Sequence, residues 1–178
     1  MMAKAKVIAV ILVCLLMGCS GKAVIPLSNI TYDSSDTNKI IYIEDIGDSK
    51  PVFELYGSGF IRRRANVFHE EMESGYLSKK QVKQLLNHII NKQRIGDLAS
   101  GYPESVIPGI EMYPNPELLL EVRINGFHKQ LRFVYSNVSD ELEYFRDEER
   151  IDEETFNELD KLRAIFRFLM KYNISKEG

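Results

Sequence analysis

The strongest structural signal in the chain is the stretch LLLEVRINGFHKQLRF at residues 118–133. Its centre, Asn125-Gly126, favours the positive φ angles of a type I′ turn, so two antiparallel strands are predicted on either side. The turn sets a register that pairs Ile124 with Phe127, Val122 with Lys129, Leu120 with Leu131 and Leu118 with Phe133. The other face then carries Arg123 opposite His128, Glu121 opposite Gln130 and Leu119 opposite Arg132. One face is therefore expected in the core and the other toward water or a polar partner.

Four further β-rich runs precede this hairpin, at residues 40–46, 52–56, 60–64 and 67–73. The first ends at a turn cluster, Gly47-Asp48-Ser49-Lys50-Pro51, in which glycine supplies a positive φ and proline fixes its own. The second and third flank Gly57-Ser58-Gly59 and are expected to form a hairpin. The run at 67–73 is the weakest of the four strand predictions.

Two amphipathic helices complete the pattern. The first is predicted over residues 79–94, because Ser78 and Gln81 have capping-box spacing and apolar residues then recur at helical intervals. The second follows Asp152, a suitable N-cap residue, with acidic residues in its first turn. The sequence therefore predicts a single α+β domain over residues 39–178. We expect an antiparallel sheet of about four to five strands, built from hairpins, with two helices packed on one face.

The beginning of the chain has the layout of an export signal. Lys4 and Lys6 precede an apolar run at 7–17, which is shorter than the roughly 20 residues of a membrane-spanning helix. The run ends in Leu16-Met17-Gly18-Cys19, which resembles the lipobox of bacterial prolipoproteins. The resemblance implies that residues 1–18 are a cleaved signal peptide and that Cys19 receives diacylglycerol. An ordinary secretory signal and an uncleaved anchor are the alternatives.

A lipidated Cys19 predicts attachment to a membrane. Several acyl chains, such as palmitate, hold a lipoprotein durably, whereas a single chain binds only marginally. In Gram-negative lipoproteins, a residue other than Asp after the cysteine favours the outer membrane, so Ser20 predicts a position there, facing the periplasm. Residues 19–38 are predicted to be the lipidated cysteine and a flexible tether. The sequence leaves open whether apolar residues of this segment dock on the domain instead, namely Val24, Ile25 and Leu27.

The composition excludes several classes of function. Cys14 leaves with the signal peptide and Cys19 carries lipid, so the mature domain has no thiol for a disulfide, a nucleophile or a zinc site. Losing Lys4 and Lys6 takes the formal charge from −3 to −5, and such an acidic chain is a poor nucleic-acid binder. The basic triplet Arg62-Arg63-Arg64 is the local exception. Its side chains would alternate between faces of a strand, which favours a solvated edge or strand end over an anion site.

Catalytic and cofactor motifs are not found in the sequence, so the chain is predicted to be non-enzymatic and to need no cofactor or metal. His69 lacks the second histidine, four residues on, that a zinc-protease helix requires. A metal site pairing His69 with Glu71 across a strand is the weaker alternative. Ser58 lacks the flanking glycine spacing of a hydrolase nucleophile elbow.

Two regions are the candidate contact surfaces. The proline-containing loop at 96–117 has a length often associated with function, although simple wrapping around the domain explains it slightly better. Its apolar side chains would form a patch if exposed: Tyr102, Ile107, Ile110, Met112 and Tyr113. The second region, at 140–154, contains nine acidic residues together with Tyr144 and Phe145. The expected partner is another envelope protein, and the oligomeric state is left open.

A further resemblance covers residues 52–173. The segments Phe53-Glu54-Leu55-Tyr56-Gly57-Ser58-Gly59 and Gly75-Tyr76-Leu77-Ser78, with Gln81-Val82, are similar to a small domain of unknown function in bacterial envelope proteins. These motifs are structural glycines and caps, so the resemblance implies an architecture and no activity. The sequence thus predicts a lipid-anchored, non-catalytic interaction module. A periplasmic inhibitor or immunity lipoprotein is the first alternative and an envelope hydrolase the second.

Overall fold

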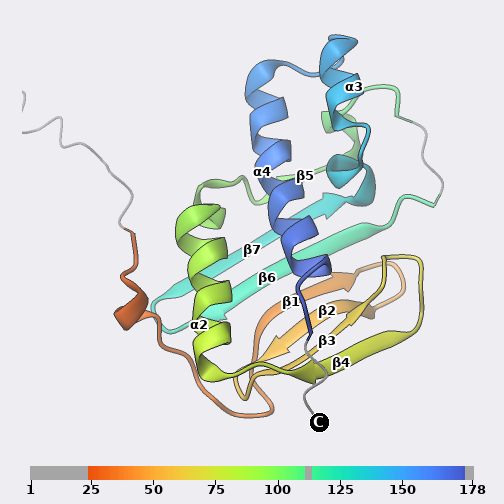
Figure 1. Cartoon of the computed structure of the whole chain (residues 1–178). Helices are drawn as coiled ribbons and strands as arrows, with labels where there is room; N and C mark the ends of the chain where they lie inside the picture. The colour runs from red at the N-terminus through yellow and green to blue at the C-terminus, as the bar shows by residue number, and fades with distance from the viewer. Residues whose placement is uncertain (1–23, 111–113, 175–178) are drawn as a thin grey trace, which may run out of the picture.

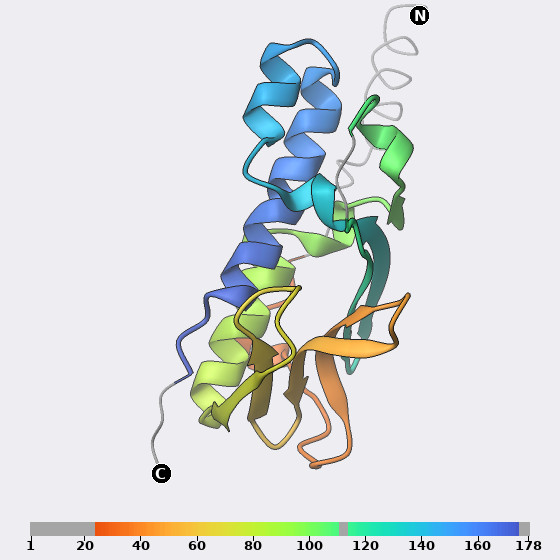
Figure 2. The ribbon, with the colours of Figure 1, turned by 90° about the vertical axis from the view of Figure 1, so that its right-hand side faces the viewer.

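The computed structural model describes residues 24–110 and 114–174, which form a two-layer α+β domain (Figure 1). Seven strands make one sheet: β1 (Lys39–Asp45), β2 (Lys50–Tyr56), β3 (Phe60–Arg64), β4 (Met72–Tyr76), β5 (Gly101–Tyr102), β6 (Glu117–Ile124) and β7 (Phe127–Val134). The α-helices are α2 (Lys79–Asn87), α3 (Leu142–Asp147) and α4 (Glu153–Met170). Helices α2 and α4 lie on one face of the sheet, and α3 packs beside α4 (Figure 2). Within these ranges, none of the helices is both long and apolar enough to span a membrane.

The α+β class is confirmed, but the sheet is larger than predicted and it is mixed. Its strand order is β4-β3-β2-β1-β6-β7-β5, and every pairing is antiparallel except the short parallel one between β5 and β7. The central strand β1 pairs with β2 on one side and with β6 on the other. Strand β5 was not predicted because it has only two residues, which carry no periodicity, and because its partner is distant in sequence.

The strands and the register of the predicted hairpin are confirmed, but its turn is not of the predicted type I′. The β6 and β7 residues pair in the expected register, from Ile124 with Phe127 to Leu118 with Phe133. Gly126 has a φ of 76°, but Asn125 is not among the residues with positive φ, whereas a type I′ turn needs positive φ at both central positions. Leu118, Leu120 and Leu131 are completely buried, so the apolar face of this hairpin lies in the core.

Both predicted helices form behind their predicted caps. Ser78 and Gln81 make the reciprocal capping box of α2, and the Asp152 carboxylate accepts a hydrogen bond from the Thr155 backbone N–H at the start of α4. After Asn87 the first helix continues as a π-helical segment, η2 (His88–Lys92). The buried side of α2 carries Leu85 and Leu86, and that of α4 carries Leu162 and Leu169. The two helices thus close the core against the sheet.

Two local predictions are corrected. The strand expected at 67–73 lies at Met72–Tyr76, because Val67 is buried in the preceding loop, where its carbonyl accepts a hydrogen bond from Arg64. The acidic stretch at 140–154 is predicted as an exposed contact surface, yet it contains helix α3. Leu142 and Phe145 of this helix are buried, so its few apolar residues outweigh the surrounding charges.

The segment preceding β1 packs on the domain, which is the alternative to a flexible tether that the sequence leaves open. A 3-10 turn, η1 (Leu27–Asn29), lies against α2, and Ile30 is completely buried. The backbone of Ile25 exchanges two hydrogen bonds with the Asn91 side chain, at 3.0 and 2.6 Å. Of the three apolar residues left open, Ile25 packs against the core, whereas Val24 and Leu27 are exposed.

Candidate interaction face

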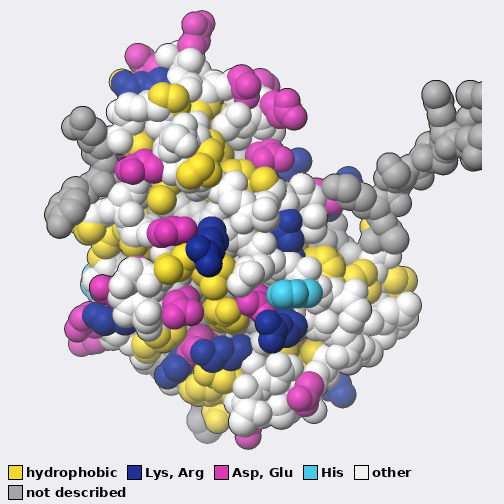
Figure 3. Space-filling model, turned by 180° about the vertical axis from the view of Figure 1, so that it is seen from behind, with side chains coloured by type: hydrophobic (Ala, Val, Ile, Leu, Met, Phe, Trp, Pro, Cys, Tyr) yellow, Lys and Arg dark blue, Asp and Glu magenta, His cyan; other side chains and the backbone are white. Residues whose placement is uncertain are grey.

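The face of the sheet opposite α2 and α4 is covered by none of the helices that the structure describes (Figure 2). We call it the open face. Seen from this side, positive, negative and hydrophobic side chains are interleaved over the strands (Figure 3). An antiparallel sheet with one face in the core and one in solvent normally alternates apolar and polar residues. The open face departs from that pattern because two of its carboxylates are buried.

A row of polar side chains crosses the open face in register. Adjacent strands place Arg62 opposite Glu54, Glu54 opposite Tyr42, Tyr42 opposite Glu121 and Glu121 opposite Gln130. The row therefore runs from β3 through β2, β1 and β6 to β7. Directly opposed residues on one face have their Cβ atoms about 5 Å apart, so each member can contact the next.

Glu54 is held as a carboxylate by two cations. Only 1% of this residue is exposed, and its oxygens form ion pairs with the Lys39 Nζ atom, at 2.6 Å, and with the Arg62 guanidinium. Burial alone would raise the pKa of Glu54, but the hydrogen bonds from Arg62 and Lys39 outweigh it and lower the pKa below the ordinary value of 4.5. Glu54 is therefore ionised at neutral pH and suits a structural role better than proton donation.

Glu121 is the second buried carboxylate of the row, with 3% of its surface exposed. It accepts a hydrogen bond from the Tyr42 hydroxyl at 2.8 Å and pairs with Arg123 at 2.5 Å and with the His128 Nε2 atom at 3.2 Å. Gln130 donates to the same carboxylate at 3.4 Å. Burial, followed by the hydrogen bond to Glu121, raises the pKa of Tyr42 to about 12. The Tyr42 hydroxyl thus stays protonated and donates to Glu121, and Arg123 and His128 contact the same carboxylate.

An aromatic cluster lies beside the charged row. Tyr56 of β2, Phe60 of β3 and Tyr76 of β4 form it, with ring centroids 5.7 Å apart for the first pair and 5.3 Å for the second. Phe60 and Tyr76 are directly opposed in the β3–β4 pairing, on the same face as Arg62. Tyr76 is 63% exposed, which makes it one of the most exposed large hydrophobic residues of the described chain.

The open face therefore combines the features of a protein-binding surface. Its carboxylates are neutralised internally, its basic groups are held in fixed positions, and its aromatic rings are partly exposed. Tyrosine, phenylalanine and arginine are enriched in protein interfaces, where rigid aromatic side chains contribute much of the binding energy. Because one carboxylate is locked by cations and its pKa is low, the arrangement favours binding over general acid catalysis.

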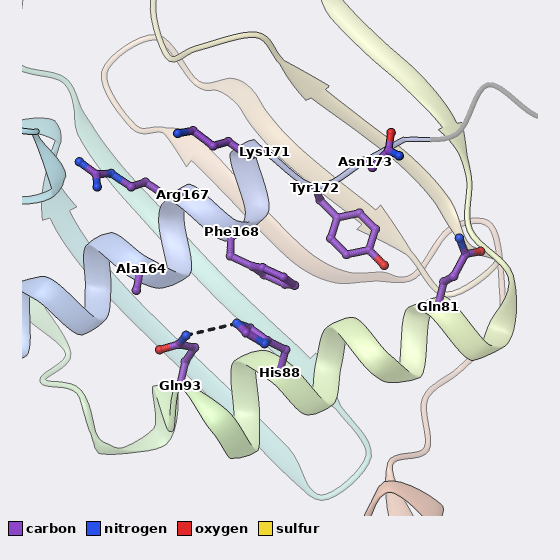
Figure 4. A pocket seen from close by; sticks show the side chains of 9 residues that line it. All are labelled: Gln81, His88, Gln93, Ala164, Arg167, Phe168, Lys171, Tyr172 and Asn173. Atoms are coloured by element: carbon purple, nitrogen blue, oxygen red, sulfur yellow. Dashed lines mark hydrogen bonds between the residues drawn. The ribbon is translucent and has the colours of Figure 1, made fainter.

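A concave region lies apart from the open face, between α2–η2 and α4 (Figure 4). It has a volume of about 670 Å³ and is open to solvent. The His88 ring stacks on Phe168 with a centroid distance of 3.9 Å and lies 3.2 Å from the Gln93 side-chain nitrogen. Burial, and then the charge of Lys92, lower the pKa of His88, so its ring is neutral at pH 7. No carboxylate lines this groove, so the described chain supplies no acidic partner for His88 in it.

The structure places the predicted contact residues differently from the prediction. Tyr102, Ile107 and Phe145 are at most 4% exposed, so they belong to the core and not to an exposed patch. Ile110 is half-buried against the core. Met112, Tyr113 and Cys19 lie outside the described residues. Tyr144 alone is clearly exposed, at 52%. The loop thus follows the wrapping alternative, because the Tyr102 hydroxyl donates a hydrogen bond to Glu158 of α4 and accepts one from the Ala99 N–H.

The acidic stretch is partly neutralised by neighbouring residues. Arg163, which is 5% exposed, donates to both oxygens of Glu143, at 2.7 and 2.6 Å. This pairing lowers the pKa of Glu143 to about 2. Asp140 pairs with Arg167, and Asp152 caps α4. Acids without a recorded ion pair remain at the tip formed by α3 and the start of α4, such as Glu148 and Glu149.

The basic triplet alternates between faces, as predicted, but β3 is an interior strand and not an edge. Arg62 lies on the open face with Glu54, whereas Arg63 donates to the Met170 carbonyl on the helix side. Sequence reasoning missed the aromatic cluster because it depends on how β2, β3 and β4 pair. One sign of it was present in the sequence, because Phe60 and Arg62 are two positions apart in a predicted strand and so lie on the same face. In the described ranges, no group of three or more potential ligand residues is suited to a metal ion.

Comparisons with known proteins give no relative of this chain. Family models, curated proteins and solved structures all fail to match it significantly. The functional argument therefore depends on the residues and geometry alone.

Proposed function

We propose that this protein is a lipid-anchored, non-catalytic interaction module of the bacterial cell envelope, and that it binds another envelope protein through the open face of its sheet. The observation that carries the proposal is the fixed charged row beside an exposed aromatic cluster. A surface with positioned arginines and partly exposed rings suits a protein partner. The hollow that Lys39, Tyr42 and Arg62 line on this face has a volume of only about 150 Å³, which is small for a ligand pocket.

The chemistry of the open face indicates what its partner presents. Lys39, Arg62 and Arg123 surround only two buried carboxylates, so the exposed parts of these ion pairs are basic. A complementary partner carries carboxylates there, next to an apolar patch that covers Tyr76 and Phe60. Charge complementarity of this kind accelerates association and makes it sensitive to salt.

A site-specific crosslink tests this contact. A photoreactive amino acid at position 76 should capture one envelope protein in intact cells, identified by mass spectrometry, and Arg62→Glu should reduce that capture at least several-fold. Lys161→Glu, on an exposed position of α4, is the matched control and should leave it unchanged. Capture from position 144 but not from position 76 would contradict the proposal, because it would move the contact to the acidic tip.

The anchor has its own test. Cys19→Ala should accumulate as an unprocessed precursor that takes up no labelled fatty acid, since the lipobox cysteine is both the acylated residue and the new amino terminus. Normal processing of this variant would overturn the lipoprotein proposal. The outer membrane is the favoured location, on the resemblance of Ser20, and fractionation of the natural protein measures it.

One observation favours the alternative of an inhibitor or immunity lipoprotein. Several exposed acids, among them Glu148, Glu149 and Glu154, lie together at the tip and have no recorded ion pair. Such a surface would neutralise a basic toxin or enzyme. Under this alternative, Glu148→Lys/Glu149→Lys would abolish partner binding, whereas Arg62→Glu would not.

A further inference from the structure

The outer flank of α2 and the segment docked on it form a basic surface with exposed apolar side chains. From Lys79 to Arg94 the chain carries five basic residues and no acidic ones, although the protein as a whole is acidic. Three of these, Lys79, Lys80 and Lys83, lie at the start of α2, and no ion pair is recorded for them within the described chain. Leu27 lies next to these three lysines, whereas Val24 lies next to Arg94, beyond the other end of α2. We call the three lysines, Leu27 and Val24 the basic flank.

The apolar members of the basic flank are held in place by the fold. Leu27 lines a shallow depression together with the three lysines. Val24 is 68% exposed and Leu27 is 45% exposed, while neighbouring Ile30 is completely buried and Ile25 is tied to Asn91. The segment therefore cannot fold Leu27 away without breaking these contacts. Exposed aliphatic side chains beside lysines are the combination that binds at the interface of an anionic membrane.

The position of the anchor brings this surface to the membrane. Four residues lie between Cys19 and Val24, so the two are five chain steps apart, and a fully extended chain spans at most about 3.5 Å per step, or roughly 17 Å here. The basic flank begins at the residue where this reach ends. The attraction of a lysine to an anionic membrane surface extends over about one Debye length, roughly 10 Å.

We propose that the basic flank docks on the anionic phospholipid surface of the membrane in which Cys19 is anchored, and so sets the orientation of the domain. The inference rests on the proposed lipidation of Cys19. The docked orientation also predicts that the acidic tip points away from the membrane. Helix α3 lies at the upper end of the domain in Figure 1, away from η1, so repulsion from the anionic lipid turns that tip outward. The domain is then held in one orientation and does not rotate freely on a tether.

A fluorescence-quenching experiment on the acylated full-length product tests this orientation. Acylation blocks Cys19 and Cys14 leaves with the signal peptide, so Leu27→Cys introduces a unique thiol for a fluorophore. In vesicles of phosphatidylcholine, phosphatidylglycerol and a nitroxide-labelled lipid, this label should be quenched several-fold more than one at Glu148→Cys. The difference should shrink in vesicles without phosphatidylglycerol, and also in 1 M salt, where the Debye length is about 3 Å.

Matched charge variants complete the test. Lys79→Gln/Lys80→Gln/Lys83→Gln should reduce quenching at position 27 at least two-fold, whereas Lys50→Gln/Lys161→Gln/Lys171→Gln removes the same charge elsewhere and should not. Equal quenching at positions 27 and 148 in an acylated protein overturns the docked orientation and leaves the anchor intact. A purified mature protein whose mass shows no acyl chain overturns the proposed anchor, and with it this inference.

Discussion

The two faces of the sheet are built from neighbouring residues of the same strands, yet one buries apolar side chains and the other buries charged and polar ones. On the covered face, Ile41, Phe53 and Leu120 are completely buried under the helices. The residue that follows each of them lies on the open face, where Tyr42, Glu54 and Glu121 form the charged row. The difference teaches that burial alone does not define a core, because the open face also contains almost fully buried groups, stabilised by ion pairs and not by apolar packing.

Truncating a covered-face residue should have the largest effect on this comparison. Phe53→Ala is expected to lower the free energy of unfolding by about 3–5 kcal/mol, because it leaves a cavity under the helices. Urea unfolding measures the change. Phe60→Ala, on the open face, removes the same ring from a half-exposed position and should cost clearly less. Equal losses for the two variants would contradict the assignment of the faces.

The charged row should show the next largest effect. Glu54→Gln keeps the size of the side chain but leaves Lys39 and Arg62 without their counter-charge, so we expect a loss of about 1–3 kcal/mol in urea unfolding. Glu73→Gln is the control, because Glu73 is 58% exposed where it pairs with Arg63. That exposed pair should contribute less than about 0.5 kcal/mol. A neutral Glu54→Gln would mean that the row is not a stabilising element.

The turn that assigns side chains to faces gives a third prediction. Gly126→Val should destabilise the domain by more than about 1 kcal/mol, because a β-branched residue resists the φ of 76° that the turn requires. A Cβ atom at Gly126 would meet no atom within 4 Å, so the cost is conformational and not a clash. Thermal unfolding measures it, and an unchanged melting temperature would show that the turn tolerates another conformation.

Acid should weaken the open face gradually, which is the smallest effect we expect. The pKa of Glu54 is lowered in the folded state, so its stabilising contribution is present above the ordinary value of 4.5 and is lost as the pH falls through the folded pKa. The unfolding free energy of the natural protein should therefore fall below pH 4.5 more steeply than that of Glu54→Gln. Parallel pH profiles for the two proteins would contradict the low pKa of this carboxylate.

The elements that were predicted correctly depend on local signals. The Asn125-Gly126 turn fixes the register of its own hairpin, and Ser78 and Asp152 mark their helices through side-chain caps. These interactions join residues only a few positions apart, so the sequence is enough to infer them.

The missed features depend on contacts between distant parts of the chain. Tyr102 is buried because Glu158 of α4 accepts its hydroxyl hydrogen bond, and η1 is docked because Asn91 binds Ile25. The charged row likewise requires β1 to pair with β6, and no periodicity specifies that pairing. The pairing of Glu121 with Gln130 in the charged row could be predicted from the β6–β7 hairpin, whereas the aromatic cluster on β2, β3 and β4 could not.

The central position of β1 also has a consequence for how the chain folds. The Tyr42 hydroxyl and its Glu121 partner are 79 residues apart in sequence, so the β1–β6 ladder closes a long loop and is expected to form late. Before β6 pairs with it, the β1 edge of the β1–β4 meander has unpaired backbone donors and acceptors. Until β6 arrives, that edge is the point at which two nascent copies would pair wrongly, and where a periplasmic chaperone would be most useful.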